Sequence, residues 1–417
     1  MKILKVVNII LPPLAEKLHI QATPFGGWIL SMINELKKYP DLKLGVAARA
    51  PIKDLIIINT DDIIYYGVPV SKTDKYDIDE AICHTVLEDF LPDLLHIDGS
   101  EFAHAKTFMQ CFNGKNVLSL QGIINGYEPH QYGGLLIDEM MFSLSIEKLL
   151  IGWSMHLQKR FFFNHRLKKE RETIKLAKNI IGRTEWDKAY SYYINSEARY
   201  FHSSEILRPV FYERKWDINR KKRYSLFVGN SYSALKGAHY AIQALALIKK
   251  EFPAVHLYIA GESPFFIKKN DFKKWIGYPL YLRRLIKKLD IKQNITFLGL
   301  LSAEEIAERM LQSHIFLLCS TIENSPNTLG EAMLLGVPCV TAYVGGVPDM
   351  ATDEQEALFY RDCEPSSLAW NVKKIFENNN LAIRLSDNAR RKALITHDKR
   401  INVNKMKSIY ETIFRNE

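Results

Sequence analysis

Residues 315–342 read IFLLCSTIENSPNTLGEAMLLGVPCVTA, and this stretch decides the fold. A short apolar run at 315–319 has the length of a buried strand, and a polar Ser-Pro-Asn loop follows it. The helical segment that comes next, through 331–335, is closed by Gly336 and Pro338, and a second apolar run covers 337–342. Strand, helix and strand in this order predict a βαβ unit on a parallel sheet.

The same alternation repeats on both sides of this stretch, so the chain is predicted to be α/β, with two Rossmann-like doubly wound domains. We expect an N-terminal domain over 1–207, a basic linker over 208–223 and a C-terminal domain over 224–396. A last helix over 397–417 could pack back on the first domain. Ligands bind beyond the carboxyl ends of such strands, which predicts a central cleft. The expected strands are 3–11, 42–47, 94–97, 116–120, 179–182, 225–228, 256–260, 295–298, 315–319 and 337–342.

Composition narrows the class of protein. The chain has 417 residues, and its net charge of +9 suits phosphate-bearing substrates or an anionic surface, although a lysine-rich solvated surface explains it as well. No zinc-finger or RNA-binding signature is present, so no nucleic acid partner is expected. The five cysteines form no C-x-x-C pair, which is typical of a reduced compartment and argues against structural zinc. No apolar run is long enough for a membrane-spanning helix, and Asn8, Pro12 and Pro13 disfavour a signal peptide.

Two carboxylates mark the strongest candidate site. Glu323 and Glu331 have seven residues between them and flank the start of the predicted helix, where free N–H groups and the helix dipole favour phosphate. The segment 323–341 resembles the E-x7-E motif of glycosyltransferase family 4, retaining enzymes of the GT-B fold. That resemblance implies that Glu323 lies near the transferred sugar and is catalytic, while Glu331 binds the ribose of the nucleotide. It also implies donor contacts at Asn327, Thr328 and Leu329.

A second segment, FVGNSYSALKG at 227–237, resembles the family's G-R-x-x-x-x-x-K-G loop, whose Arg and Lys hold the donor diphosphate. Lys236 matches the lysine, and we expect it to stabilise the leaving diphosphate as a point charge. Asn230 stands where the family has Arg, and an amide does not supply that charge. The resemblance further implies donor contacts at Gly299 and at Gly345-Gly346.

In the N-terminal half the resemblance is looser. Gly26-Gly27 is similar to the family's N-terminal Gly-Gly, which lets the backbone approach the donor phosphates. An ordinary turn can have the same two glycines. Gln121 stands where many members carry His and keeps hydrogen-bonding capacity without titrating. His96 is the nearby alternative, or a structural histidine. Arg183 follows a predicted strand, and our hypothesis is that it supplies the charge missing at Asn230.

Residues 155–178 contain Phe161, Phe162 and Phe163 and eight Lys or Arg against two Glu. A basic stretch with aromatics can lie on an anionic membrane, but a helix with one packed face has the same composition. The resemblance makes the first interpretation attractive, since many family members use lipid-linked acceptors at the membrane, and both interpretations stay open. It also predicts a cytoplasmic protein, peripheral on the inner face of the cell membrane.

The expected function is transfer of a sugar, with retention, from a nucleotide-diphosphate sugar to a glycan or polyprenyl-linked acceptor. Cell-surface polysaccharide assembly, such as capsule or exopolysaccharide, follows from the resemblance. No D-x-D signal stands at a convincing strand end, so no metal or other cofactor is expected. Two alternatives stay open: a GT-B sugar-nucleotide epimerase, and a degenerate donor-binding protein that assists a partner enzyme, which Asn230 and Gln121 favour.

Overall fold

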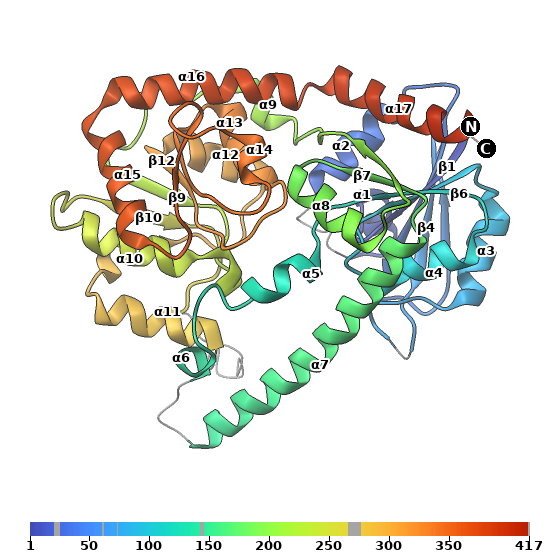
Figure 1. Ribbon diagram of the computed structural model, residues 1–417, viewed down its shortest axis with the longest axis horizontal. Helices are drawn as coiled ribbons and strands as arrows, with labels where there is room; N and C mark the ends of the chain where they lie inside the picture. Colours follow the sequence, from blue (N-terminus) through green and yellow to red (C-terminus); the bar gives the residue numbers. More distant parts are fainter. Residues whose placement is uncertain (21–25, 61, 73, 142–145, 266–276, 416–417) are drawn as a thin grey trace. The chain divides into compact units, whose positions relative to one another are not determined.

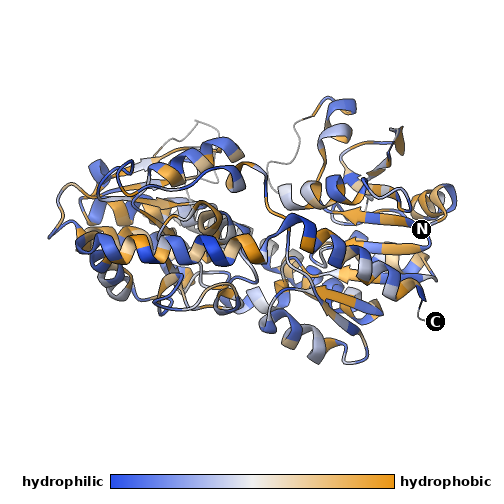
Figure 2. Cartoon of the chain, turned by 90° about the horizontal axis from the view of Figure 1, so that it is seen from above, coloured by the Kyte–Doolittle hydropathy of each residue, from blue (hydrophilic) through white to orange (hydrophobic). Residues whose placement is uncertain are grey.

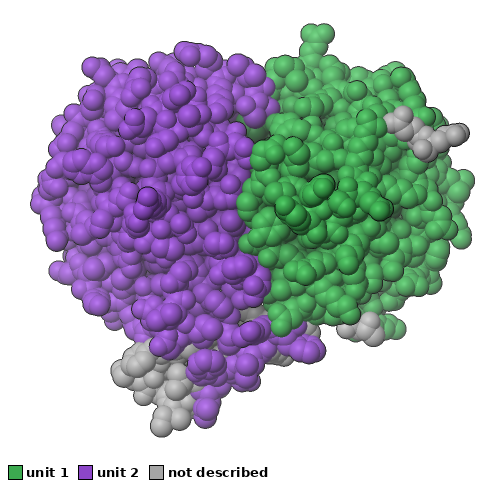
Figure 3. All heavy atoms as spheres, viewed as in Figure 1, with its two compact units in different colours: residues 1–126, 162–207, 397–417 green, residues 127–161, 208–396 purple. Residues whose placement is uncertain are grey.

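The computed structural model describes residues 1–20, 26–60, 62–72, 74–141, 146–265 and 277–415. The chain forms two compact units (Figure 3). Unit 1 contains residues 1–126, 162–207 and 397–417, and unit 2 contains residues 127–161 and 208–396. This division differs from the expected boundaries in one segment, because residues 127–161 were expected in the first domain and pack with the second half of the chain.

Unit 1 is built on an eight-stranded sheet, sheet A, with strand order β3-β4-β2-β1-β5-β6-β7-β8. All neighbouring pairs are parallel except β3 with β4. The chain runs from β1 outward to one side and crosses to β5 on the other, so the topological switch point lies at β1. The strands are β1 (Lys2–Val7), β2 (Lys43–Ala50), β3 (Ile56–Asn59), β4 (Ile63–Pro69), β5 (Leu94–Asp98), β6 (Lys115–Ser119), β7 (Asn179–Gly182) and β8 (Arg199–His202).

Two apolar layers cover the faces of sheet A, because alternate residues of a strand point to opposite sides. Ile3 and Val7 of β1 belong to the layer that includes α2 and α17, and Leu4 and Val6 belong to the layer that includes α3 and α4. The helices of unit 1 are α1 (Pro12–Lys17), α2 (Gly27–Leu36), α3 (Glu80–Phe90), α4 (Ala103–Cys111), α8 (Glu185–Ile194) and α17 (Lys399–Arg415), and two helices, α5 (Ile124–Tyr127) and α7 (Ile146–Leu176), continue from one unit into the other (Figure 1).

Unit 2 is built on sheet B, which is entirely parallel and has the order β11-β10-β9-β12-β13-β14. Its strands are β9 (Ser225–Val228), β10 (His256–Ile259), β11 (Ile295–Phe297), β12 (Ile315–Leu318), β13 (Cys339–Ala342) and β14 (Ala357–Tyr360). Its helices are η1 (Glu128–His130), α6 (Ile137–Met141), α9 (Val210–Glu213), η2 (Ala234–Lys236), α10 (Ala238–Ile248), α11 (Gly277–Lys288), η4 (Lys292–Asn294), α12 (Ala303–Gln312), α13 (Asn327–Leu335), α14 (Val347–Met350), α15 (Pro365–Glu377) and α16 (Asn379–Thr396).

Local sequence explains many of these boundaries. Ser302 and Glu305 form a reciprocal capping box at the start of α12. Most strands of both sheets are coloured as apolar, and the helices carry both apolar and polar turns (Figure 2). This pattern is expected when strands are covered on both faces and helices on one.

Some expected boundaries were wrong. The first strand was predicted over 3–11 but ends at Val7, and the loop expected after it contains α1, because Pro12 and Pro13 suit the first positions of a helix. The strands β3, β4, β8 and β14 were not predicted. The helix α13 begins at Asn327, four residues before Glu331, so Glu331 lies in its second turn.

Candidate functional site

Two loops meet at the carboxyl edge of sheet B and bring Lys236 to Glu323. Lys236 ends η2 after β9, and its Nζ lies 2.6 Å from Oε1 of Glu323, which follows β12. The same carboxylate oxygen accepts a hydrogen bond of 2.6 Å from Ser320 Oγ. Gly237 makes this approach possible: its φ is +67°, and a Cβ there would lie 1.8 Å from the Cys319 carbonyl oxygen.

The backbone of Glu323 is held by the glycine pair after β13. The Gly346 N–H donates to the Glu323 carbonyl at 3.0 Å. A Cβ on Gly345 would lie 2.0 Å from the same carbonyl oxygen, so the close approach requires glycine. These contacts leave the Glu323 side chain nearly buried, with its carboxylate oriented by Lys236 and Ser320.

Glu331 makes a two-pronged ion pair within unit 2. Arg208 Nε donates to Oε1 at 2.6 Å, and Arg208 Nη2 donates to Oε2 at 2.7 Å. Burial raises the pKa of Glu331, and the hydrogen bonds and charge of Arg208 oppose that rise. Nothing in the sequence around Arg208 connects it to a carboxylate 123 positions away, so no role was predicted for this arginine.

The N-terminus of α13 lies at the same edge of the sheet. The N-cap residue Pro326 provides no side-chain cap, so first-turn N–H groups are available to a ligand. Asn327 Oδ1 is buried and has no hydrogen-bond partner among the described residues. Thr328 is half-buried beside it. Leu329 is fully buried, so its side chain belongs to the core and is not available to a ligand.

Asn230 follows β9 and Gly299 follows β11, and β10 lies between these two strands in sheet B. The Asn230 side-chain oxygen accepts a hydrogen bond of 2.9 Å from the Tyr232 N–H and stabilises the loop after β9. Gly299 follows β11 with a φ of +74° and exchanges two backbone hydrogen bonds with Gly261. Both residues therefore lie where the sequence placed them, beyond the carboxyl ends of strands of sheet B.

A segment that the sequence analysis missed packs against these loops. The Asn324 N–H donates to Tyr127 Oη at 3.1 Å, and the Gly133 carbonyl accepts from Tyr240 Oη at 2.7 Å. A Cβ on Gly133, whose φ is +59°, would lie 2.2 Å from the Ala234 carbonyl oxygen. Residues 127–134 thus support both the loop that carries Lys236 and the loop that carries Glu323.

Gly26 and Gly27 begin α2 in unit 1. Gly26 is the N-cap with a φ of +82°, and no side chain caps this helix start. A Cβ on Gly26 would lie 2.6 Å from Ile9 Cδ1, which explains the glycine. Pro24 and Phe25, quoted with this motif, lie outside the described residues.

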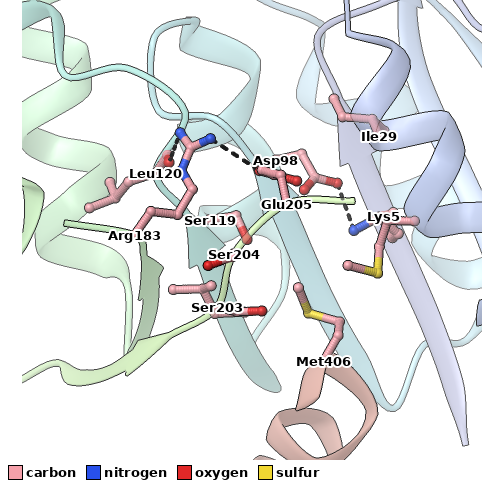
Figure 4. Close-up of a pocket in the computed structure, with 12 residues that line it drawn as sticks. Lys5, Ile29, Asp98, Ser119, Leu120, Arg183, Ser203, Ser204, Glu205 and Met406 are labelled. Atoms are coloured by element: carbon pink, nitrogen blue, oxygen red, sulfur yellow. Dashed lines mark hydrogen bonds and ion pairs between the residues drawn. The ribbon is translucent and has the colours of Figure 1, made fainter. Parts of the chain in front are cut away.

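Gln121 and Arg183 lie together at the carboxyl edge of sheet A. Gln121 Nε2 donates to Glu205 Oε1 at 3.1 Å, and Arg183 Nη2 donates to the carbonyls of Leu120 and Gln121 at 2.9 and 2.8 Å. Arg183 Nη1 lies 3.4 Å from Glu205 Oε1 (Figure 4). Arg183 is thus engaged by partners in unit 1, and compensation for Asn230 stays a prediction.

The cavity beside these residues has a volume of about 20 Å³ and is lined by Lys5, Asp98, Arg183, Glu205 and others (Figure 4). Such a volume holds about one water molecule and does not admit a sugar. Its charges are balanced internally, since Lys5 Nζ lies 2.8 Å from Asp98 Oδ2.

His96 is a buried structural residue. Its Nδ1 lies 2.6 Å from Tyr410 Oη and 3.0 Å from Lys5 Nζ, and its Nε2 lies 2.7 Å from Ser119 Oγ. Burial, with the charge of Lys5, lowers the pKa of His96 to about 3, so the ring is neutral at neutral pH. The alternative that His96 contacts the sugar is not supported by this placement.

Across the described ranges, no group of three or more His, Cys, Asp or Glu side chains is arranged to hold a metal ion. None of the described helices has the length and apolarity needed to cross a membrane.

Comparison with known proteins connects this geometry to a family. The family described as Glycosyl transferases group 1 matches residues 211–392. N-acetyl-alpha-D-glucosaminyl L-malate synthase of Bacillus anthracis is 24% identical over 202 residues, which are 48% of this chain and 48% of that protein. The chain is matched over about half the length of this curated relative.

Two solved structures share the fold over the whole chain. Sucrose-phosphate synthase from Thermosynechococcus elongatus has a TM-score of 0.71 at 12% identity, covering 99% of both chains. Anabaena HepE in complex with UDP-glucose has a TM-score of 0.69 at 16% identity, covering 99% of this chain and 100% of that one. The chain therefore has the GT-B fold, and its residues 211–392 are similar to the group 1 glycosyl transferases.

Proposed function

We propose that the protein transfers a sugar, with retention of configuration, from a nucleotide-diphosphate sugar bound at the carboxyl edge of sheet B. The observation that carries this proposal is the contact between Lys236 and Glu323 beside the uncapped N-terminus of α13. A cation, a carboxylate and free helix N–H groups at one edge suit a substrate with an anionic diphosphate and a hydroxyl-bearing sugar.

Lys236 stabilises the leaving diphosphate in this mechanism. An ammonium has three N–H donors, so it can keep its contact with Glu323 and still donate to a phosphate oxygen. Glu323 orients a sugar hydroxyl and stabilises positive charge that develops at the anomeric carbon. The unpartnered Asn327 Oδ1 is suited to accept a hydrogen bond from a hydroxyl of the same substrate.

Glu331 binds the ribose in this proposal. An ionised carboxylate has about four lone-pair positions, and Arg208 uses two of them. The others can accept hydrogen bonds from two vicinal hydroxyls. Arg208 is therefore a positioning residue, and its charge and hydrogen bonds favour the ionised form of the buried carboxylate.

The proposed acceptor is a glycan or a polyprenyl-linked sugar at the inner face of the cell membrane, in polysaccharide assembly. Exposed apolar side chains on α7 support membrane contact. Leu150, Trp153, Leu157 and Phe161 are exposed at helical spacing on one face, and Arg160 lies beside them. Farther along the predicted 155–178 segment, Phe163 is half-buried and Ile174 is fully buried, so the proposed contact shifts to 150–161.

The alternatives give different products. An epimerase would change its nucleotide sugar without an acceptor. A degenerate donor-binding protein would bind a nucleotide but never release it from a nucleotide sugar, and Asn230 and Gln121 are the residues that favour it.

The test begins with thermal stabilisation by UDP, GDP, ADP and CMP at millimolar concentration. A ligand at 100 times its Kd adds about 2.7 kcal/mol to the free energy of unfolding. We expect one nucleotide to act strongly and to lose most of its effect in Glu331→Gln. Its sugar conjugates are then assayed for nucleotide release with and without acceptors. Lack of stabilisation by any nucleotide would contradict the donor site.

A further inference from the structure

Two arginines and two aromatic rings form a cluster in unit 1 that the proposed donor chemistry does not use. The guanidinium carbon of Arg49 lies 5.7 Å from the Tyr76 ring centre and 5.0 Å from that of Phe102. The guanidinium carbon of Arg166 lies 5.1 and 5.0 Å from the same two ring centres. All four side chains are half-buried, so the cluster is open to a ligand.

Three of the four residues lie at the carboxyl edge of sheet A. Arg49 is the penultimate residue of β2, Tyr76 follows β4, and Phe102 is the N-cap of α4 after β5, while Arg166 comes from α7. The strands β2 and β5 flank β1, where the order of the sheet reverses. Ligands of doubly wound sheets bind beyond the carboxyl ends of the strands at such a switch point.

Neither guanidinium has a carboxylate oxygen within ion-pair distance in the part of the chain that the structure describes. Arg49 Nη1 donates to the Lys75 carbonyl, and Arg166 Nε and Nη2 donate to the Glu101 carbonyl at 3.2 and 3.0 Å. Each guanidinium has five N–H donors, so these contacts leave donors for a ligand.

The nearby acids bind other groups. Asp74 Oδ1 accepts from the Tyr76 N–H at 2.8 Å, and its Oδ2 lies 3.4 Å from His165 Nε2. Asp77 accepts from Thr107 Oγ1 at 2.6 Å, and its Oδ2 lies 3.6 Å from Lys169 Nζ.

Glu101 is engaged at one oxygen, because its Oε1 accepts from the Gly122 N–H at 2.7 Å, while its Oε2 is buried without a hydrogen-bond partner among the described residues. The two arginine charges are thus held on the same pair of rings without a direct counter-ion. Burial lowers the pKa of Arg49, the charges of Asp74 and Asp77 oppose this effect, and the charge of Arg166 lowers the pKa further. Aromatic faces attract both cations but do not neutralise them. An anion that contacts both guanidiniums would offset the repulsion between their charges.

The loops that carry the rings are tied to each other. The His104 N–H of α4 donates to the Tyr76 carbonyl at 3.2 Å, and Thr107 of the same helix donates to Asp77. The two rings therefore hold the guanidiniums in a preformed position, which lowers the entropic cost of binding.

We infer that Arg49 and Arg166 form an anion subsite, which binds a phosphate or carboxylate group of the acceptor. The paired N–H donors of a guanidinium match the oxygens of a planar carboxylate or a tetrahedral phosphate. That the bound anion belongs to an acceptor rests on the proposed glycosyl transfer. The existence of the anion subsite does not depend on that proposal.

Calorimetric titration of the full chain with sodium pyrophosphate, D-glucuronate and neutral D-glucose tests the inference without any donor. We expect at least one anion to bind, and to bind at least tenfold more weakly to Arg49→Gln and Arg166→Gln. Binding of pyrophosphate alone would identify a phosphate-bearing acceptor. Binding of glucuronate alone would identify an acceptor with an acidic sugar. Binding of neither anion, or equal binding of glucose, would overturn the inference.

Two controls separate this subsite from other effects. Arg199→Gln removes a guanidinium that lies 4.8 Å from the Phe201 ring centre at the amino end of β8, and it should bind the anion normally. Lys236→Gln removes the proposed donor-phosphate cation in unit 2. Loss of anion binding only in Lys236→Gln would assign the anion to the donor site and overturn the inference.

If a glutamine variant does not fold, the lysine variants Arg49→Lys and Arg166→Lys replace it. They keep the positive charge but lose the paired N–H donors of the guanidinium. They should bind with intermediate affinity, and wild-type affinity in both would contradict the assignment. If the protein binds the anion but transfers no sugar, the proposed function is wrong and this inference stands. If it transfers a sugar but binds no anion, this inference is wrong and the proposed function stands.

Discussion

Arg208 and Glu331 pair through two parallel hydrogen bonds, with Nε 2.6 Å from Oε1 and Nη2 2.7 Å from Oε2. The pair joins the segment after β8 to the second turn of α13, and the exposed side-chain fractions are 19% for Arg208 and 4% for Glu331. A buried carboxylate that loses its partner keeps its desolvation cost without compensation. The proposed ribose ligand therefore depends on an arginine far from it in sequence.

Arg208→Gln should lower the free energy of unfolding by about 3 kcal/mol, because it leaves Glu331 buried without a cation. Urea unfolding measures this loss. The matched control is Arg214→Gln, which breaks the exposed pair with Glu308 and should cost at most about 1 kcal/mol. Equal costs in the two variants would show that the Arg208 pair is not a buried one in solution.

Lys236→Gln should lower kcat for nucleotide release by about 100-fold, because it removes the cation proposed to stabilise the leaving diphosphate. The melting temperature should fall less than in Arg208→Gln, since Glu323 keeps its hydrogen bond with Ser320. Lys215→Gln, which removes an exposed lysine paired with Asp387, is the control and should leave kcat unchanged. An unaltered kcat in Lys236→Gln would refute the role given to this lysine.

Gly133→Ala should destabilise unit 2 by about 2 kcal/mol or more, because the added Cβ would meet the Ala234 carbonyl oxygen at 2.2 Å. Gly277→Ala is a matched control, since Gly277 has a φ of +68° and a Cβ there would meet nothing within 4 Å. The difference in urea midpoint between the two variants reports the close approach alone. If they behave alike, residues 127–134 do not pack on the Lys236 loop.

Stability should fall as the pH drops from about 6.5 toward 4. Burial lowers the pKa of His397 to about 4, so the folded chain binds fewer protons there than the unfolded chain, whose histidines titrate near 6.5. The stabilisation is therefore present above pH 6.5 and is lost during acidification. The pKa values of other buried histidines are also lowered, to about 3 for His96, His104 and His314 and about 4 for His239.

Melting temperatures between pH 4 and 7 test this expectation. His397→Asn should reduce the pH dependence, whereas His84→Asn, at an exposed position, should not change it. A wild-type melting temperature that does not fall in this range would contradict the burial of neutral histidines.

The double variant Leu157→Glu/Phe161→Glu should bind at least tenfold more weakly to phosphatidylglycerol-containing vesicles at low salt, because it removes apolar contact and adds negative charge. Phe161 is 73% exposed, so the changes should not affect folding. Co-sedimentation measures binding, and Ile395→Glu, at an exposed apolar position on α16, is the control. Failure of the wild-type protein to bind such vesicles would remove the proposed membrane contact.

Local patterns predicted much of the fold. The apolar run at 315–319 and the glycine at 336 correspond to β12 and to the end of α13, because strands and helix ends are encoded by residues close together in the chain. The strands β3, β4, β8 and β14 were missed; β8, for example, reads RYFH and contains no continuous apolar run that would predict a strand. Glu323 was predicted to lie in the loop between a strand and a helix, and it lies between β12 and α13.

The sequence by itself determined the two parallel sheets and the carboxyl edge at which Lys236, Glu323 and the start of α13 lie, because these depend on neighbouring residues and on glycines with special backbone geometry. Only the tertiary structure decided which distant side chains meet. The Arg208 pair with Glu331, the packing of residues 127–134 on unit 2, the burial of His96 and the joint position of Arg49 and Arg166 all depend on packing between segments far apart in the chain. Side-chain contacts of this kind have no local periodicity, so no pattern in the sequence indicates them before the chain is folded.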